Sequence, residues 1–188
     1  MIHISNKESR PRLPEKIYLI GSGKSLNDNH DRIPDNSYRV YLNGSVAIDG
    51  AKPDLWFAHC QSNPTKNWWM QAYKKHYNIS FFGNFITDMG FPSKFYFKFY
   101  EDLSKRQIVT GTTVAGIAMQ LLPEFGVKHM VLVGIDLSDS YRFDGSFNLE
   151  NSDPKWTAIV DTLNKVIDNR QDCCYYSLGK TRLNIDEE

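Results

Sequence analysis

Cysteine is scarce in this sequence, and the few cysteines present do not form a disulfide framework. Cys60, Cys173 and Cys174 are the only three in 188 residues, no CxxC spacing occurs, and two adjacent cysteines can hardly bond to each other. We therefore expect reduced, buried thiols. A chain of this length buries enough apolar surface to fold without disulfides or a structural metal.

Neither sign of charge is in excess. Lys plus Arg and Asp plus Glu both number 22, so the formal net charge is zero. This balance removes the chain-wide electrostatic argument for binding nucleic acid or an anionic membrane. The sequence also contains no Asp-x-Asp motif and no cluster of His and Cys, so a bound metal has no support.

Long apolar runs are missing as well. No apolar stretch approaches the ~20 residues that a transmembrane helix needs. The start of the chain, Met1-Ile2-His3-Ile4, lacks the long apolar core of a signal peptide. We therefore expect a cytoplasmic protein without a transmembrane segment.

The chain does contain short apolar runs at regular intervals, separated by helical patterns. Residues 1–15, with prolines and several charges, are predicted to be a loose lead-in, and residues 16–188 a single α/β domain. The aromatic segment 94–100 is predicted to be extended at a sheet edge, because lysines alternate into it. Strands are predicted at 17–20, 38–42, 55–58, 80–82, 130–133 and 174–176, and helices at 25–31, 64–76, 114–122 and 154–168. The third helix begins at a Thr112 or Thr113 cap and is closed by Pro123 and Gly126.

Strands that alternate with helices and lack a polar face predict a mostly parallel sheet with helices on both sides, a three-layer α/β sandwich. Ligands of such sheets bind beyond the carboxyl ends of the strands. All five predicted strand ends are polar or rich in glycine, which is the main argument for a binding site. They are Gly21–Ser25, Asn43-Gly44, His59–Gln61, Thr110–Thr112 and Asp136–Ser138.

The turn Gly21–Ser25 contains Gly-Lys-Ser but is not a P-loop, because Tyr18 stands where the first glycine belongs. It is not a full dinucleotide fingerprint either, because Leu26 occupies the third glycine position. What remains is a strand, a tight turn and a helix start, which can bind phosphate or ribose. A purely structural turn is the alternative.

Two polar residues at strand ends have similar alternatives. Asp136 can accept hydrogen bonds from ribose hydroxyls or cap the following turn, and His59 can be catalytic or structural. The other histidines, His3, His30, His76 and His129, are interpreted as surface or helix-end residues.

Three motifs in chain order carry a resemblance to a known family. They are Gly21-Ser22-Gly23-Lys24-Ser25-Leu26, Leu42-Asn43-Gly44, and Gly134-Ile135-Asp136 followed by Tyr141-Arg142-Phe143-Asp144. The set resembles the bacterial sialyltransferases of glycosyltransferase family 42, and also the related DUF115 proteins, which include an archaeal pterin diphosphokinase. The resemblance implies a Rossmann-like, single-domain variant of the GT-A fold, a CMP-sialic acid donor and no metal.

The resemblance also implies roles for individual residues at the strand ends. Phosphate and ribose would be held by Gly21, Ser22, Gly23 and Ser25, the donor by Asn43, and the nucleotide by Thr110, Gly111 and the neighbouring Thr112, with Asp136 beside the nucleotide sugar. Tyr141 matches a family tyrosine that bonds the leaving phosphate. Our candidates for stabilising that phosphate are Arg106, Tyr141 and Lys24.

The sequence departs from the family at several of these places. Lys24 replaces a proline, Ser22 an asparagine, and Ser138 the second of two tyrosines. The stretch 147–153 is short and lacks the family's general-base histidine. An acceptor hydroxyl needs a base, so His59 is the first candidate, ahead of Glu150 and Asp153.

The sequence therefore predicts a metal-independent, glycosyltransferase-like protein. It would use a nucleotide sugar of CMP-sialic acid type as donor substrate, an unknown glycan or small molecule as acceptor, and no tightly bound cofactor. One alternative is a pterin-type diphosphokinase relative that uses ATP. Another is a nucleotide-binding module that lost the lid and the base. Homo-oligomerisation through segment 94–100 is left open.

Overall fold

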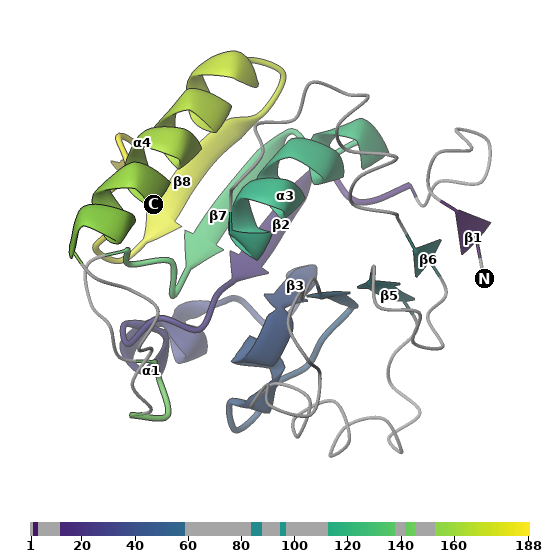
Figure 1. The fold of residues 1–188 in the computed structure, drawn as a ribbon. Coiled ribbons are helices and arrows are strands. Elements are labelled where there is room, and N and C mark those ends of the chain that lie inside the picture. Colours follow the sequence, from purple (N-terminus) through teal and green to yellow (C-terminus); the bar gives the residue numbers. More distant parts are fainter. Residues whose placement is uncertain are drawn as a thin grey trace.

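The structure is a computed structural model that describes residues 2–3, 12–58, 84–87, 95–96, 113–137, 142–145 and 153–188. These residues form one nine-stranded sheet of order β1-β6-β5-β4-β3-β2-β7-β8-β9, in which every neighbouring pair is parallel (Figure 1). The strands are β1 Ile2–His3, β2 Lys16–Ile20, β3 Arg39–Leu42, β4 Leu55–Ala58, β5 Asn84–Thr87, β6 Phe95–Tyr96, β7 His129–Val133, β8 Cys174–Leu178 and β9 Asp186–Glu187. The α-helices are α1 Leu26–Asn29, α3 Val114–Leu121 and α4 Asp153–Asn169, and short 3₁₀ helices span His30–Arg32, Asn43–Ala47 and Leu122–Phe125.

The strand order changes direction at β2. From β2 the chain proceeds outward through β3, β4, β5 and β6, and it then returns to the other side of β2 with β7, β8 and β9. Two strands that lie side by side but lead their connections to opposite sides of a sheet leave a crevice at their carboxyl ends. In this protein the switch point of the strand order lies beyond Ile20 and Val133, which are register partners.

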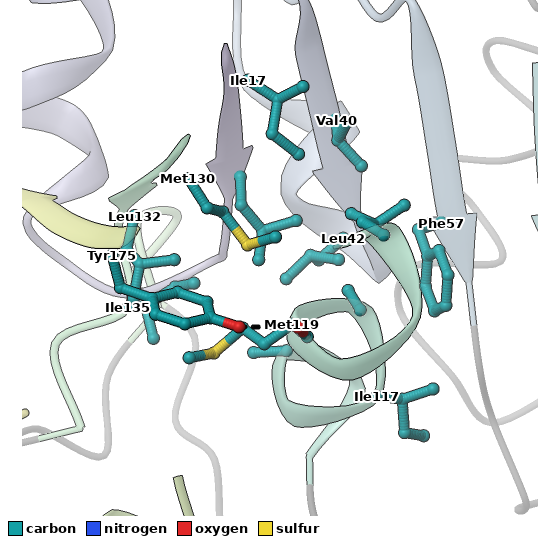
Figure 2. Packing of buried hydrophobic residues seen from close by; sticks show 14 of the residues in the cluster. Ile17, Val40, Leu42, Phe57, Ile117, Met119, Met130, Leu132, Ile135 and Tyr175 are labelled. Atoms are coloured by element: carbon teal, nitrogen blue, oxygen red, sulfur yellow. Dashed lines mark hydrogen bonds between the residues drawn. The ribbon is translucent and has the colours of Figure 1, made fainter. Parts of the chain in front are cut away.

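The two faces of the sheet are buried by different elements. Alternate strand residues such as Ile17, Leu19 and Met130 pack against α3 and α4, as Figures 1 and 2 show. The residues between them, such as Tyr18, Ile20 and Val131, pack on the other side against Leu26, Ile33 and Val46. Burial on both faces explains why these strands lack a polar face, and it confirms the predicted three-layer sandwich with a mostly parallel sheet.

Helix α3 begins and ends where the sequence predicts. The Thr113 hydroxyl caps it by accepting from the Gly116 N–H at 3.4 Å, and Gly126, at φ 102°, closes the following 3₁₀ turn. Pro123 has no N–H to donate to the Met119 carbonyl, its i−4 partner. The buried Tyr175 hydroxyl of β8 donates to that carbonyl instead, at 2.9 Å (Figure 2).

Most of the remaining element predictions hold. The strands predicted at 17–20, 38–42, 55–58, 130–133 and 174–176 and the last helix are confirmed to within two residues at every boundary. The helix at 64–76 and the strand at 80–82 lie outside the described residues. Strand β5 was not predicted, since polar Asn84 and Thr87 stand at its ends.

Other expectations need correction. The predicted edge segment contains β6, which is covered by β1 and so is not the edge. Within the predicted loose lead-in, Ile2–His3 pairs with β6 and Leu13 is only 6% exposed. Cys173 is a buried free thiol as expected, with a pKa raised by burial to about 12, but Cys174 is exposed. Cys60 lies outside the described residues.

His30 lies at a helix end, which is one of its two interpretations from sequence, but it is not a surface residue. It is 7% exposed, and its Nε2 lies 2.8 Å from the Tyr41 hydroxyl. The buried Arg39 guanidinium on β3 donates to the carbonyls of Ile33 and Pro34. Burial, followed by the charge of Arg39, lowers the pKa of His30, and exposed Asp31 opposes this shift more weakly.

We expect Tyr175→Phe to destabilise the protein by about 1–3 kcal/mol, because the buried Met119 carbonyl loses its donor. Urea denaturation followed by tryptophan fluorescence measures the change. Tyr176→Phe removes a hydroxyl from the next residue, which is half-buried, and should stay within about 0.5 kcal/mol. Equal losses in the two variants would contradict this assignment.

The lowered pKa of His30 predicts that the protein loses stability on acidification. Its pKa in the folded protein lies below the ordinary 6.5, so the unfolded chain binds the proton more readily. Stability from this group is therefore complete above pH 6.5 and falls as the pH drops through the lower, folded-state value. His30→Gln, which can still bond the Tyr41 hydroxyl, should flatten the fall in urea midpoint between about pH 7.5 and 5.5. A parallel pH dependence in both proteins would rule this out.

Candidate functional site

The glycine-rich turn after β2 is bound to the turn after β7. The Gly21 N–H donates to the Val133 carbonyl at 2.8 Å, and the Gly23 N–H donates to the Gly134 carbonyl at 2.7 Å. Helix α1 follows the turn, beyond the arrowheads of β2 and β7 in Figure 1. The predicted site segment therefore lies at the crevice where the strand order changes direction.

Close backbone contact explains why glycines occupy both turns. A Cβ on Gly21 would lie 2.6 Å from the Gly134 carbonyl oxygen, and one on Gly23 would lie 2.8 Å from the Asp136 carboxyl carbon. Gly134 has φ +63°, and its Cβ would lie 2.9 Å from the Gly21 oxygen. The turn is thus structural at its glycines, and any ligand must be recognised by the groups between them.

The Asp136 side chain holds this turn through hydrogen bonds with Ser25. Its carboxylate accepts from the Ser25 N–H at 2.8 Å and from the Ser25 hydroxyl, and the residue is 8% exposed. The turn that Asp136 holds is the one after β2, not the turn that follows Asp136 in the chain, and the predicted contact of Asp136 with a ribose remains a prediction. Because both Ser25 donors are paired with Asp136, the predicted contact of Ser25 with a ligand remains a prediction, and Ser25 contributes the shape of the turn.

Ser22 and Lys24 lie between the residues of the turn that are bound to the turn after β7. Among the residues that the structure describes, none accepts a hydrogen bond from the Ser22 N–H. Ser22 is half-buried and Lys24 is exposed. Backbone N–H groups and a nearby ammonium are the usual donors to a phosphate.

Asn43 reaches the same edge from β3. Its backbone is left-handed, with φ +46°, and its carbonyl accepts from the Trp56 indole at 2.6 Å. Ser45, two residues on, donates to the Ile20 carbonyl at 2.7 Å and so ties this turn to the end of β2. Leu137 is the second non-glycine residue with positive φ (57°) in the described chain. Both strained positions follow strand ends, as is common at binding sites.

A short segment that sequence analysis did not assign to the site lies across the turn. The Phe143 N–H donates to the Ser22 carbonyl at 3.1 Å, and the Asn27 amide donates to the Phe143 carbonyl at 2.6 Å. Arg142 forms an antiparallel bridge with Gly23. The Tyr-Arg-Phe-Asp motif marked this segment in the sequence, but the sequence could not predict that the segment contacts the glycine-rich turn.

A second unpredicted segment, 179–183, supports the end of β7. The Thr181 hydroxyl donates to the Ile135 carbonyl at 2.8 Å, and the Arg182 guanidinium donates to the Leu137 carbonyl at 3.3 Å. At Gly179, φ is +103°, and a Cβ would lie 2.5 Å from the Asn29 amide nitrogen. That amide donates to the Ser25 carbonyl at 2.9 Å, so β8 also buttresses the turn.

The structure brings together Gly21, Ser22, Gly23, Lys24, Ser25 and Asp136, with Asn43 on the adjoining turn. The other predicted site residues lie outside the described residues. They are His59, Arg106, Thr110, Gly111, Thr112, Ser138 and Tyr141. Their roles remain predictions.

Among the described residues, no three His, Cys, Asp or Glu side chains are grouped as a metal site would need. None of the described helices combines the length and apolar character required to cross a membrane.

An open hollow of about 430 Å³ lies at the opposite, amino end of the sheet. It is lined by residues that include Lys16, Tyr18, Tyr38 and Asp54. Lys16 and Asp54 already have partners there, Glu188 and the Arg39 N–H. The hollow is separate from the candidate site.

Comparison with solved structures places this fold among the glycosyltransferases, whereas no family model and no curated protein matches the sequence. The MAf glycosyltransferase from Magnetospirillum magneticum AMB-1 superposes on 94% of the chain with a TM-score of 0.63 and 15% identity. The chain spans only 33% of that protein.

The sialyltransferase CstII from Campylobacter jejuni, solved with the substrate analogue CMP-3FNeuAc, covers 88% of the chain with a TM-score of 0.54 and 16% identity. In this case 81% of the other chain is covered. At these identities the likeness shows the fold alone. The protein has a single-domain, Rossmann-like glycosyltransferase fold, as predicted.

We expect Asp136→Asn to cost about 1.5–3 kcal/mol of stability, because an amide presents only one acceptor to the two Ser25 donors and loses the charge. Urea denaturation measures the loss. Asp28→Asn, an exposed change in the first turn of α1, should stay within about 0.5 kcal/mol. An Asp136→Asn variant as stable as the wild type would show that the Ser25 contact does not hold the turn.

Proposed function

We propose that the protein binds a nucleotide-activated sugar, of the CMP-sialic acid type, at the carboxyl ends of β2, β3 and β7, and that it is a metal-independent glycosyltransferase. One observation carries the proposal. The glycine-rich turn lies at the crevice between β2 and β7, in a fold shared with a sialyltransferase solved with CMP-3FNeuAc. In folds of this class, that crevice is where nucleotides bind.

The described groups suit a phosphate and a sugar in different ways. The Ser22 N–H and the Lys24 ammonium provide donors for a phosphate, while the Asn43 amide can both donate and accept, as a ribose or sugar hydroxyl requires. Asp136 would act through the turn it holds rather than by direct contact. The family resemblance adds Thr110 and Gly111 on the nucleotide and Thr112 and Ser138 beside it.

The proposed reaction is a substitution at the sugar's anomeric carbon. An acceptor hydroxyl forms the new glycosidic bond while the bond from that carbon to the phosphate oxygen breaks, and CMP leaves. His59 would take the hydroxyl proton. Arg106, Tyr141 and Lys24 would stabilise the negative charge that develops on the departing phosphate.

A nucleotide panel tests the proposal. CMP should raise the melting temperature without Mg²⁺, and a ligand at 100 times its Kd stabilises by about 2.7 kcal/mol, which is several degrees for a domain of this size. CDP, UDP, GDP and ATP are measured beside it. The proposal is wrong if no nucleotide shifts the transition. A shift by ATP that requires Mg²⁺ would favour the diphosphokinase alternative, and CMP binding without release of CMP from CMP-sialic acid would favour a binding module.

Asn43→Gly is the matched variant for this panel. Glycine accepts the left-handed backbone of Asn43 without strain, so the substitution removes the amide alone. We expect CMP affinity to fall by about tenfold, the worth of one or two hydrogen bonds, and the urea midpoint is measured beside it. Unchanged affinity would remove Asn43 from the site.

A further inference from the structure

The feature that carries a further inference is the pairing of Arg142 with Gly23 at the tip of the glycine-rich turn. The two residues form an antiparallel bridge. The flanking hydrogen bond joins the Phe143 N–H to the Ser22 carbonyl at 3.1 Å. In such an arrangement the bridged residues are a non-hydrogen-bonded pair, with Cα atoms about 4.5 Å apart and side chains close together.

The pairing also fixes the side on which the Arg142 side chain begins. Bridged residues of an antiparallel pair carry their side chains on the same face. On Gly23 that face is turned toward Asp136, since a Cβ there would lie 2.8 Å from the Asp136 carboxyl carbon. The Arg142 side chain therefore starts beside the missing side chain of Gly23, on the Asp136 side of the turn.

The charge of Asp136 makes this position important for an anionic ligand. Asp136 is a nearly buried carboxylate directly behind the turn. Any phosphate that accepts from the Ser22 N–H would be repelled by it, because like charges are poorly screened where water is excluded. Such a site needs a cation on the same side of the turn.

Among the described residues, two cations flank this turn. Lys24 is exposed, on a flexible stem. Arg142 is half-buried, and its backbone is fixed to the turn by the bridge to Gly23 and by the contacts of the next residue, Phe143, with Ser22 and Asn27. A guanidinium also matches the oxygens of a phosphate in pairs.

We infer that Arg142 is a specificity-determining residue that binds the phosphate of the nucleotide and offsets the charge of Asp136. The inference deepens the proposed function and rests on it. Arg142 distinguishes a nucleotide from a nucleoside, whereas Asn43 binds a part that the two share.

The test compares Arg142→Gln with the wild type toward three probes, CMP, cytidine and inorganic pyrophosphate, by calorimetry. We expect the affinities for CMP and pyrophosphate to fall by about 10- to 100-fold, as for a lost charge-assisted hydrogen bond. The affinity for cytidine should stay within about twofold. Lys180→Gln, which removes the same charge from an exposed position at this edge of the sheet, is the control and should leave all three within about twofold.

Each possible result of this experiment supports or overturns the inference about Arg142. CMP and pyrophosphate affinities that do not change in Arg142→Gln overturn the inference and leave the proposed function standing. Equal losses for CMP and cytidine, with a lower urea midpoint, also overturn it, because they indicate a structural role. If the wild type binds pyrophosphate but not CMP and the variant loses pyrophosphate, the inference is supported and the CMP assignment fails. If the wild type binds none of the probes, both fail.

Discussion

The contact on which the crevice depends is the close approach of two backbone turns, at Gly21 and Gly134. β2 and β7 are neighbours whose connections lead to opposite sides of the sheet, so the chain must turn away twice in a small volume. A side chain on either glycine would lie under 3 Å from the other's carbonyl oxygen. With both glycines in place, the turns hydrogen-bond to each other, and the Asp136 carboxylate accepts from the Ser25 N–H.

This arrangement separates the residues that build the turn from those that can meet a ligand. Gly21, Gly23 and Ser25 use their donors within the protein. Ser22 and Lys24 alternate with them. The alternation explains how a sequence can resemble a phosphate loop without being one, since three of its five residues build the turn and the other two are those proposed for binding.

The sequence reveals the parts of the fold that depend on local patterns. Buried strands such as Ile17–Ile20 and Met130–Val133 are apolar on both faces, and helix α3 has a cap and a stop, so each could be predicted without its neighbours. Contacts between distant residues could not. Asp136 lies 111 residues from Ser25, and nothing local to Arg142 or Thr181 indicates that they meet the turns after β2 and β7. The burial of His30 could not be predicted for the same reason, because its partner Tyr41 lies on a strand.

Electrostatics connects these distant contacts to the function. A buried carboxylate is a good way to hold a tight turn, because its charge strengthens two hydrogen bonds at once. The same charge lies directly behind the place where a phosphate would bind, so one interaction both shapes the crevice and opposes its ligand. A protein with this construction needs a compensating cation that is fixed to the turn itself. The bridge between Gly23 and Arg142 provides that attachment, and Gly23 is the residue that leaves room for it. Gly23, which resembles a phosphate-loop glycine in the sequence, thus contributes to the proposed site by pairing with Arg142 and not by contacting the phosphate itself.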